Sequence, residues 1–179
     1  MSAWKGIVGR SFTAAAFAEY VGELSFPDWA PSFVVVHNTY SPTLANWHDV
    51  PGASRMRGLE NYYRDIQKWS AGPHLFVAAD FIWAFTPLIT PGVHSPSWNA
   101  NSWGVETTGD WDTETPPPAL MENLVSALAA LHEAAGIDPA TLRFHREDPL
   151  TTHKHCPGAN LDKADLIGRI QTRLSPLVT

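Results

Sequence analysis

The chain has 179 residues, a length that fits one domain with a sizeable hydrophobic core. Hydrophobic residues make up 44% of it and charged residues 17%, a balance typical of globular proteins and not of disordered chains. The net charge of -6 disfavours a surface that binds nucleic acid, so we expect no nucleic-acid partner.

Cysteine use and apolar runs bear on where the protein is made. Cys156 is the only cysteine, so the fold cannot depend on an intramolecular disulfide or on an oxidising compartment. Glu19 interrupts the apolar run that starts at Phe12, which leaves that run too short for a signal-peptide core. No run reaches the roughly 18 apolar residues of a membrane span. We expect a monomer made in the cytoplasm, without a signal peptide and without membrane insertion.

Two helices and one strand are expected in the first part of the chain. Residues 11–24 have apolar positions at helical spacing, and Ser11 is placed to cap that helix. The apolar run 33–36 contains three consecutive valines and predicts a buried strand that ends at His37. Residues 40–54 hold two prolines and a glycine and are expected to form a loop, and residues 56–69 form the second helix.

The middle of the chain predicts a hairpin and a further strand. Residues 74–78 and 81–85 are apolar runs joined by two residues, which favours an antiparallel pair. Residues 87–101 form a long loop with three prolines, and long loops in compact domains are often functional. Residues 102–108 form another strand, in which Glu106 stands where a core strand prefers an apolar residue.

The last part of the chain adds two helices. A surface loop at 110–118 precedes the longest helix, 119–135, which ends at Gly136. A short extended segment at 142–145 leads into a polar loop at 146–158, and a helix follows at 161–174. Strands and helices mix without a repeating unit. We therefore expect an α/β fold with a central mixed β-sheet flanked by helices, in a single domain of residues 1–179 that includes the N-terminal helix.

Three residues are candidates for a metal site: His37, His145 and Cys156. His37 stands at the end of a buried strand, where its ring would be held rigidly and would face a cleft. Zinc binds imidazole and thiolate, and a catalytic zinc site uses three protein ligands and a water. The short paired spacing of a zinc finger is missing, so spacing alone does not identify the site.

Other roles for Cys156 stay open at this point. Its neighbours His153, Lys154 and His155 make a polar turn, which argues against a small buried hydrophobic residue. Cys156 could act as a nucleophile with one of the two candidate histidines as its base, which requires a thiolate of low pKa. His153 or His155 could also replace it as a metal ligand.

Three motifs, in this order along the chain, carry a resemblance to a known family. They are FVVVHNT at 33–39, SWGVE at 102–106, and His145 followed by KHCPG at 154–158. Together they resemble the zinc-dependent type 2 N-acetylmuramoyl-L-alanine amidases, which include phage endolysins, bacterial muropeptide amidases and animal peptidoglycan recognition proteins. The resemblance covers about residues 33–170. It implies a mixed sheet with flanking helices and a zinc ion in an open groove.

The resemblance also implies roles for individual residues. His37, His145 and Cys156 match the zinc ligands of the family, so Zn²⁺ is the expected cofactor. Glu106 matches the proton acceptor of the muropeptide branch. Lys154, two residues before the cysteine, matches the catalytic lysine.

Residues near these positions are expected to contact the substrate. His94 lies where many members have a histidine in the loop before the Gly-Val-Glu strand, and Asn38 and Thr39 directly follow the first histidine motif. Many members have a tyrosine where this chain has Pro73. This departure assigns the proton transfer to Glu106.

The activity that the resemblance implies is hydrolysis of the amide bond between the lactyl group of N-acetylmuramic acid and L-alanine, in peptidoglycan or in muropeptides. We expect a bacteriolytic, phage-type endolysin that acts on the cell wall. Two alternatives stay open: a module that binds peptidoglycan or muropeptides without cutting them, and a cytoplasmic amidase of muropeptide recycling.

Overall fold

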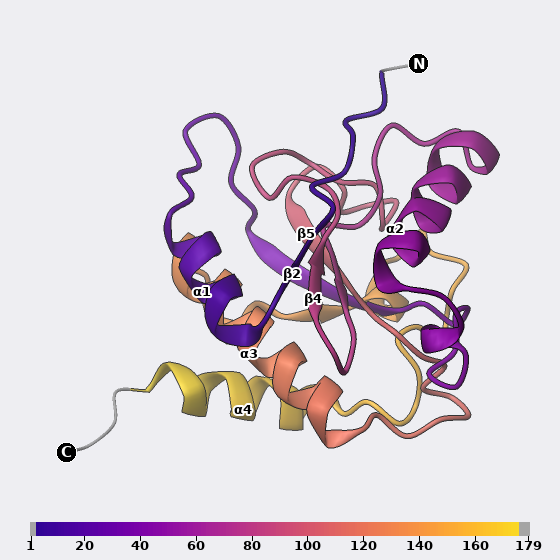
Figure 1. Ribbon diagram of the computed structural model, residues 1–179. Coiled ribbons are helices and arrows are strands. Elements are labelled where there is room, and N and C mark those ends of the chain that lie inside the picture. The colour runs from indigo at the N-terminus through magenta and orange to yellow at the C-terminus, as the bar shows by residue number, and fades with distance from the viewer. Residues whose placement is uncertain (1–2, 176–179) are drawn as a thin grey trace.

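A six-stranded mixed sheet runs through the centre of the computed structural model, which describes residues 3–175 (Figure 1). From one edge to the other, the strands are β1 (Arg10–Phe12), β4 (Ile82–Ala84), β3 (Leu75–Val77), β5 (Ser102–Thr107), β2 (Phe33–Asn38) and β6 (Arg143–Phe144). The β1–β4 and β4–β3 pairs are antiparallel, and the other three pairs are parallel. The expected mixed sheet flanked by helices is therefore confirmed.

The β2 strand lies inside the sheet, between β5 and β6. Its three consecutive valines are fully buried because a parallel strand in the middle of a sheet is covered on both faces. Side chains alternate between the two faces along a strand. Val34 and Val36 therefore point to one side of the sheet, and Val35 and His37 point to the other.

Helices cover both faces of this sheet, and each side has its own apolar cluster. The α1 (Ala14–Gly22), α3 (Pro118–Ala135) and α4 (Lys163–Leu174) helices pack on the face to which Val34 and Val36 point. The α2 helix (Gly52–Asn61) packs on the opposite face, where Met56 meets Phe76 of β3. His37 thus belongs to the α2 side of the sheet, away from the larger cluster.

Most predicted elements are confirmed to within a few residues. The strands predicted at 33–37 and 102–108 appear as β2 and β5, and the predicted hairpin appears as β3 and β4. The helices at 119–135 and 161–174 appear as α3 and α4. The predicted domain, 1–179, also includes residues 1–2 and 176–179, which lie outside the described residues.

The predicted N-terminal helix, 11–24, is too long at both ends. Residues Arg10–Phe12 form β1 instead, because they complete the sheet edge along β4, with Ser11 opposite Trp83. The helix starts at Ala14, and its cap is Thr13, whose hydroxyl accepts a hydrogen bond from the Ala16 N–H at 3.3 Å. The assignment of Ser11 as the cap was wrong.

The predicted boundaries of the second helix were also wrong. The α2 helix starts at Gly52, within the segment expected to be a loop, and a 3₁₀ turn (Trp47–Asp49) precedes it. Gly52 is needed there for packing, since a Cβ at this position would lie 2.3 Å from the Trp83 ring. After Asn61 the chain continues as one turn of π-helix, Tyr62–Ile66. Such turns are frequent at functional sites.

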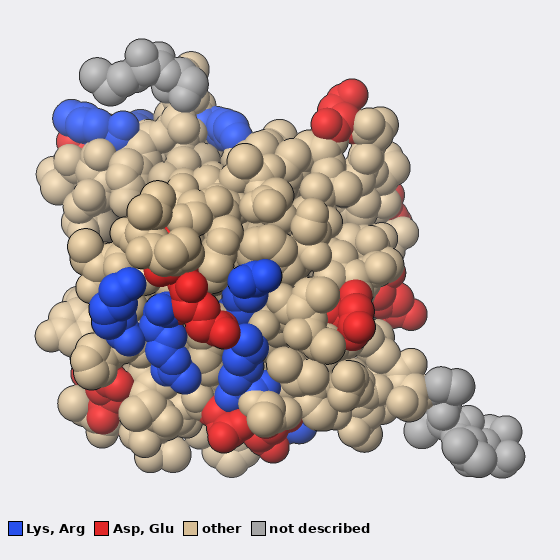
Figure 2. Space-filling model, turned by 180° about the vertical axis from the view of Figure 1, so that it is seen from behind, with Lys and Arg blue, Asp and Glu red and all other residues tan. Residues whose placement is uncertain are grey.

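The surface carries charges of both signs. Figure 2 shows acidic side chains among the basic ones on one face of the molecule. In the C-terminal part, Lys163 pairs with Glu147 at 2.8 Å and Arg169 with Asp165 at 3.7 Å. Within residues 3–175, no helix combines the length and the apolar character needed to cross a membrane.

The cap of α1 gives a direct test of this part of the fold. Thr13→Ala should lower the free energy of unfolding by about 1 kcal/mol, because an N–H at the start of the helix loses its partner. Ser11→Ala is the matched control and should have a much smaller effect, since Ser11 lies on β1. Urea unfolding of both variants measures the difference. A larger loss for Ser11→Ala would contradict this boundary.

Candidate metal centre

Strand pairing brings the two candidate histidines together. His37 lies near the end of β2, and His145 directly follows β6, in which Phe144 pairs with Val36. The two imidazole rings are 4.4 Å apart between centroids. The loop after His145 brings Cys156 close to them, because the Cys156 carbonyl accepts a hydrogen bond from the Arg146 N–H at 2.9 Å. Ligand atoms of the two histidines and of the Cys156 thiol all lie within 4.8 Å of one another.

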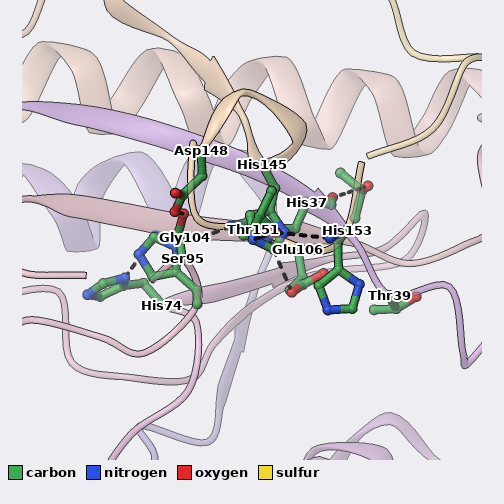
Figure 3. A network of polar contacts seen from close by, with 12 residues as sticks. His37, Thr39, His74, Ser95, Gly104, Glu106, His145, Asp148, Thr151 and His153 are labelled. Carbon is green, nitrogen blue, oxygen red and sulfur yellow. Dashed lines mark hydrogen bonds and ion pairs between the residues drawn. The ribbon is translucent and has the colours of Figure 1, made fainter. Parts of the chain in front are cut away.

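Glu106 stands next to this group on the same face of the sheet. It occupies the β5 position that pairs in register with His37, and its Oε1 lies 4.0 Å from His37 Nδ1 (Figure 3). Its other oxygen, Oε2, is buried and has no hydrogen-bond partner. Burial raises the pKa of Glu106 to about 8. The carboxyl group is therefore available to carry a proton near neutral pH.

Burial also sets the protonation of the three candidate ligands. It holds the pKa of His37 well below its ordinary value, with a smaller contribution from His145, and it lowers the pKa of His145 to about 4. Both imidazoles are thus neutral at pH 7 and have a lone pair for a metal. Burial and the nearby Glu106 raise the pKa of the Cys156 thiol, so a metal ion must displace its proton.

Hydrogen bonds to His94 determine which nitrogen of His37 is free. His94 Nε2 lies 3.3 Å from the Ser102 carbonyl, which only accepts hydrogen bonds, so this nitrogen carries the proton. Burial lowers the pKa of His94 to about 3, so its Nδ1 is an acceptor. His37 Nε2 donates to it at 3.1 Å. The lone pair of His37 is left on Nδ1, the nitrogen that faces Glu106.

Tight packing behind His37 keeps the His94 ring in place. A Cβ at Gly104 of β5 would lie 2.3 Å from the His94 ring, so this strand position requires glycine. Asp148 connects the loop that carries His94 to the loop after His145, because its carboxylate accepts a hydrogen bond from the Ser95 hydroxyl (Figure 3). It also accepts a hydrogen bond from the Ser97 hydroxyl. These bonds lower the pKa of Asp148 to about 2 against the opposing effect of burial.

A second contact fixes the His145 ring. Its Nε2 lies 2.9 Å from the Thr151 hydroxyl, and the same hydroxyl accepts a hydrogen bond from the His153 N–H at 3.1 Å (Figure 3). Metal-binding histidines commonly use their second nitrogen in this way. Both rings are therefore oriented before any metal binds.

The candidate centre opens into a cavity of about 650 Å³. The residues that line it are His37, Asn38, Thr39, Tyr40, Ser41, Leu59, Tyr62, Tyr63, Gln67, Trp69, Pro73, Val93, His94, Glu106, His145, His153 and Cys156. The expected metal ligands, Glu106 and all three expected substrate contacts are among them. Lys154 is exposed and does not line the cavity, although the adjacent His153 does.

Sequence reasoning missed the aromatic wall of the cavity. Tyr62, Tyr63 and Trp69 fall within the predicted helix 56–69, but they line the cavity from the π-helical turn and the segment after it. Tyr63 stacks on Trp69 at 5.1 Å. Burial and then the nearby Glu106 raise the pKa of Tyr63 well above its ordinary value. The irregular end of α2 is the only feature that indicates this aromatic wall, and the spacing of apolar residues in the sequence does not reveal that irregular end.

The donor set fits zinc. Two neutral imidazoles and one thiol lie within reach of one ion, and zinc prefers nitrogen and sulfur ligands over the all-oxygen sets of calcium and magnesium. Three protein ligands leave a fourth position, and the unpartnered Oε2 of Glu106 lies beside them. Three protein ligands are the pattern of catalytic zinc sites, whereas structural zinc sites use four.

Residues 27–159 match the family model described as N-acetylmuramoyl-L-alanine amidase. The chain belongs to the N-acetylmuramoyl-L-alanine amidase family. The match includes the three candidate ligands and Glu106, and it confirms the resemblance drawn from the motifs.

Two insect proteins are similar in sequence to this amidase-family chain. Peptidoglycan-recognition protein LB of Drosophila melanogaster is 27% identical over 159 residues, which cover 87% of this chain and 65% of that protein. Peptidoglycan-recognition protein 1 of Holotrichia diomphalia is 28% identical over 91 residues, covering 50% of this chain and 45% of that protein. The chain thus spans about two thirds of the first relative and about half of the second.

Solved structures show the same fold. An endolysin N-acetylmuramoyl-L-alanine amidase of Clostridium intestinale superposes with a TM-score of 0.59 at 23% identity, over 80% of this chain and 85% of that one. A point mutant of Drosophila peptidoglycan recognition protein LB, in complex with tracheal cytotoxin, superposes with a TM-score of 0.65 at 23% identity, over 92% of this chain and 86% of that one. These likenesses establish the fold of the family in this chain.

Substitution of the thiol tests the ligand set. Cys156→Ser should weaken zinc binding by more than the roughly 10–100-fold that follows loss of an outer-shell partner. His155→Ala is the matched control, because His155 directly precedes Cys156 but is exposed. Its Nδ1 lies 3.8 Å from Oδ2 of Asp112. Zinc content after dialysis, measured by mass spectrometry, separates the two. Unchanged zinc in Cys156→Ser, or its loss in His155→Ala, would remove Cys156 from the set.

The raised pKa of Glu106 predicts how the stability of the metal-free protein depends on pH. Above pH 4.5 the unfolded chain releases this proton, whereas the folded chain keeps it until about pH 8. Between pH 7 and 8 Glu106 should therefore lower the free energy of unfolding, by up to about 1.4 kcal/mol per pH unit. The buried histidines act in the opposite direction, because their ordinary pKa of 6.5 leaves them partly protonated in the unfolded chain at pH 7 and neutral in the folded one. Since they do so in both proteins, the contribution of Glu106 is the difference between the wild type and Glu106→Gln: urea unfolding in chelator should give a more negative slope against pH in the wild type, and equal slopes would contradict the prediction.

Proposed function

We propose that the protein is a zinc-dependent amidase that hydrolyses the bond between N-acetylmuramic acid and L-alanine in peptidoglycan or muropeptides. The observation that carries the proposal is the convergence of two neutral imidazoles and a thiol beside Glu106, a buried carboxyl group whose Oε2 has no hydrogen-bond partner. His37, His145 and Cys156 would hold the ion. When bound, zinc would supply a Lewis acid for the amide carbonyl and for water.

Glu106 is the proposed proton carrier. Its carboxylate takes a proton from the attacking water, whose oxygen forms the new bond to the amide carbon. The same proton then passes to the nitrogen of the leaving L-alanine as the carbon–nitrogen bond breaks. A buried carboxyl group with a free oxygen and a pKa near neutrality suits both steps.

Lys154 is the proposed source of positive charge for the oxyanion that develops on the carbonyl oxygen. It lies on the same turn as His153 and Cys156, both of which line the cavity. His94 positions His37 for the reaction: it accepts a hydrogen bond from Nε2 of His37, which leaves Nδ1 of His37 free for the metal. Asn38 and Thr39 line the cavity and are proposed to contact the substrate.

A lysin of the phage type that acts on the cell wall is the proposed setting, and the structural likeness to an endolysin amidase supports it. The sequence similarity to peptidoglycan-recognition proteins favours a second candidate, a module that binds muropeptides without cutting them. Cys156 argues for the enzyme, since it completes a three-ligand site. A muropeptide-recycling amidase would use the same centre on soluble substrates.

Digestion of purified peptidoglycan tests the reaction. Mass spectrometry should find new free L-alanine amino termini, and a chelator should abolish them. Glu106→Ala should retain zinc but lose about 10²–10⁴-fold in rate, because the proton carrier is gone. Glu133→Ala, an exposed carboxylate on α3, is the control and should keep full activity. Bound zinc without any cleavage would favour the binding module, and activity that survives the chelator would exclude a metal mechanism.

A further inference from the structure

The turn from Thr151 to Cys156 directs two neighbouring basic side chains to different places. His153 lines the cavity, whereas Lys154 is exposed and lies outside the cavity lining. Hydrogen bonds hold the backbone of this turn. The His153 N–H donates to the Thr151 hydroxyl at 3.1 Å, and the Cys156 N–H donates to the His153 carbonyl at 3.2 Å. The backbone therefore fixes which of the two side chains reaches the cavity.

The His153 ring faces the candidate centre. Its centroid lies 5.5 Å from that of the His145 ring, and the two rings are tilted by 30°. Burial and then the charge of His153 lower the pKa of His145. After burial and the other two histidines of the site, His153 also contributes to the lowered pKa of His37. Figure 3 shows the ring extending toward the side of the cavity where Glu106 lies.

Although it is close, His153 does not belong to the candidate ligand set. The ligand atoms that converge within 4.8 Å among the described residues are those of His37, His145 and Cys156. His37 and His145 each use one ring nitrogen in a hydrogen bond within the protein. Within residues 3–175, neither ring nitrogen of His153 has such a partner. Since an imidazole carries at least one N–H in either protonation state, His153 has a free donor for a bound molecule.

The cavity otherwise offers little positive charge to a reacting carbonyl group. Among the described residues that line it, none is Lys or Arg. Negative charge develops on the carbonyl oxygen when water attacks an amide, and donors that are already oriented inside a cavity stabilise that charge most effectively. His153 brings a side-chain N–H to the neighbourhood of the candidate ligands, where Lys154 does not reach.

We propose that His153 is a further catalytic residue, whose ring N–H donates a hydrogen bond to the carbonyl oxygen of the scissile amide as negative charge develops there. The inference rests on the proposed function, which supplies the amide. The ring gives up no proton in this role, because Glu106 carries the proton from water to the leaving nitrogen. Lys154 adds its charge from outside the cavity.

The experiment removes the donor and keeps the ring. In His153→Phe the aromatic contact with His145 is retained, but no N–H remains. We expect kcat on peptidoglycan fragments to fall about 10²–10³-fold, as for loss of one oxyanion donor, with KM changed less than twofold. Zinc content and melting temperature should stay at the wild-type level, because His153 is exposed and is not a ligand.

Two matched variants separate the donor from other effects. His153→Gln keeps a side-chain N–H and should recover part of the lost kcat. His155→Phe makes the same change two residues along the turn, at an exposed side chain outside the cavity lining, and should keep full activity.

Binding of a transition-state analogue provides a readout that does not depend on turnover. The probe is a muropeptide in which a tetrahedral phosphonate group replaces the scissile amide, titrated by calorimetry into the zinc-loaded protein. His153→Phe should weaken its binding by about the factor lost in kcat, because the analogue imitates the charged oxygen. Affinity for the cleaved peptide product should change less than twofold.

The outcomes distinguish this inference from the proposed reaction. Loss of zinc in His153→Phe, an unchanged kcat, an equal loss in His155→Phe, or equal weakening of analogue and product would each overturn the role of His153. Peptidoglycan cleavage by the wild type would still support the amidase in those cases. Analogue binding that depends on His153, in a wild-type protein that cleaves nothing, would leave the contact standing and refute the amidase.

Discussion

The parallel pairing of β2 with β5 on one side and with β6 on the other fixes the geometry of the site. His37 and Glu106 are register partners, and His145 follows β6, whose last residue pairs with the one before His37. A slip of one residue would send each of these side chains to the opposite face of the sheet. Val34 and Val36 oppose such a slip because it would remove them from the larger apolar cluster. Core packing and site geometry therefore depend on the same register.

Burial then gives each group of the site its chemical state. The same loss of water that keeps His37 and His145 neutral keeps Glu106 and Cys156 protonated in the absence of a metal. A divalent ion held by His37, His145 and Cys156 would displace the thiol proton and would bind the imidazoles in their neutral form. Loop contacts, above all those of Asp148, hold the rings in place. The side chains of the candidate centre are thus already oriented in the metal-free protein.

The sequence alone predicted the mixed sheet and the residues that converge at the candidate centre, because both depend on strong local signals. Three consecutive valines mark β2, and the order of three motifs identified the histidines, the cysteine and Glu106. It failed where tertiary contacts override local preference. Ser11 pairs with β4 and does not cap a helix, and Gly52 starts α2 at a place where the Trp83 ring leaves no room for a Cβ. The aromatic wall depends on a π-helical turn that no periodicity reveals.

The central claim is that two imidazoles and one thiolate share a single zinc ion at the mouth of the cavity. X-ray absorption spectroscopy of the zinc-loaded protein tests it most directly, because the first shell reports both the kind and the number of ligands. The account predicts one sulfur at about 2.3 Å and two imidazole nitrogens at about 2.0–2.1 Å, with an oxygen completing four-coordination. A shell without sulfur, or with a third imidazole in its place, would contradict it.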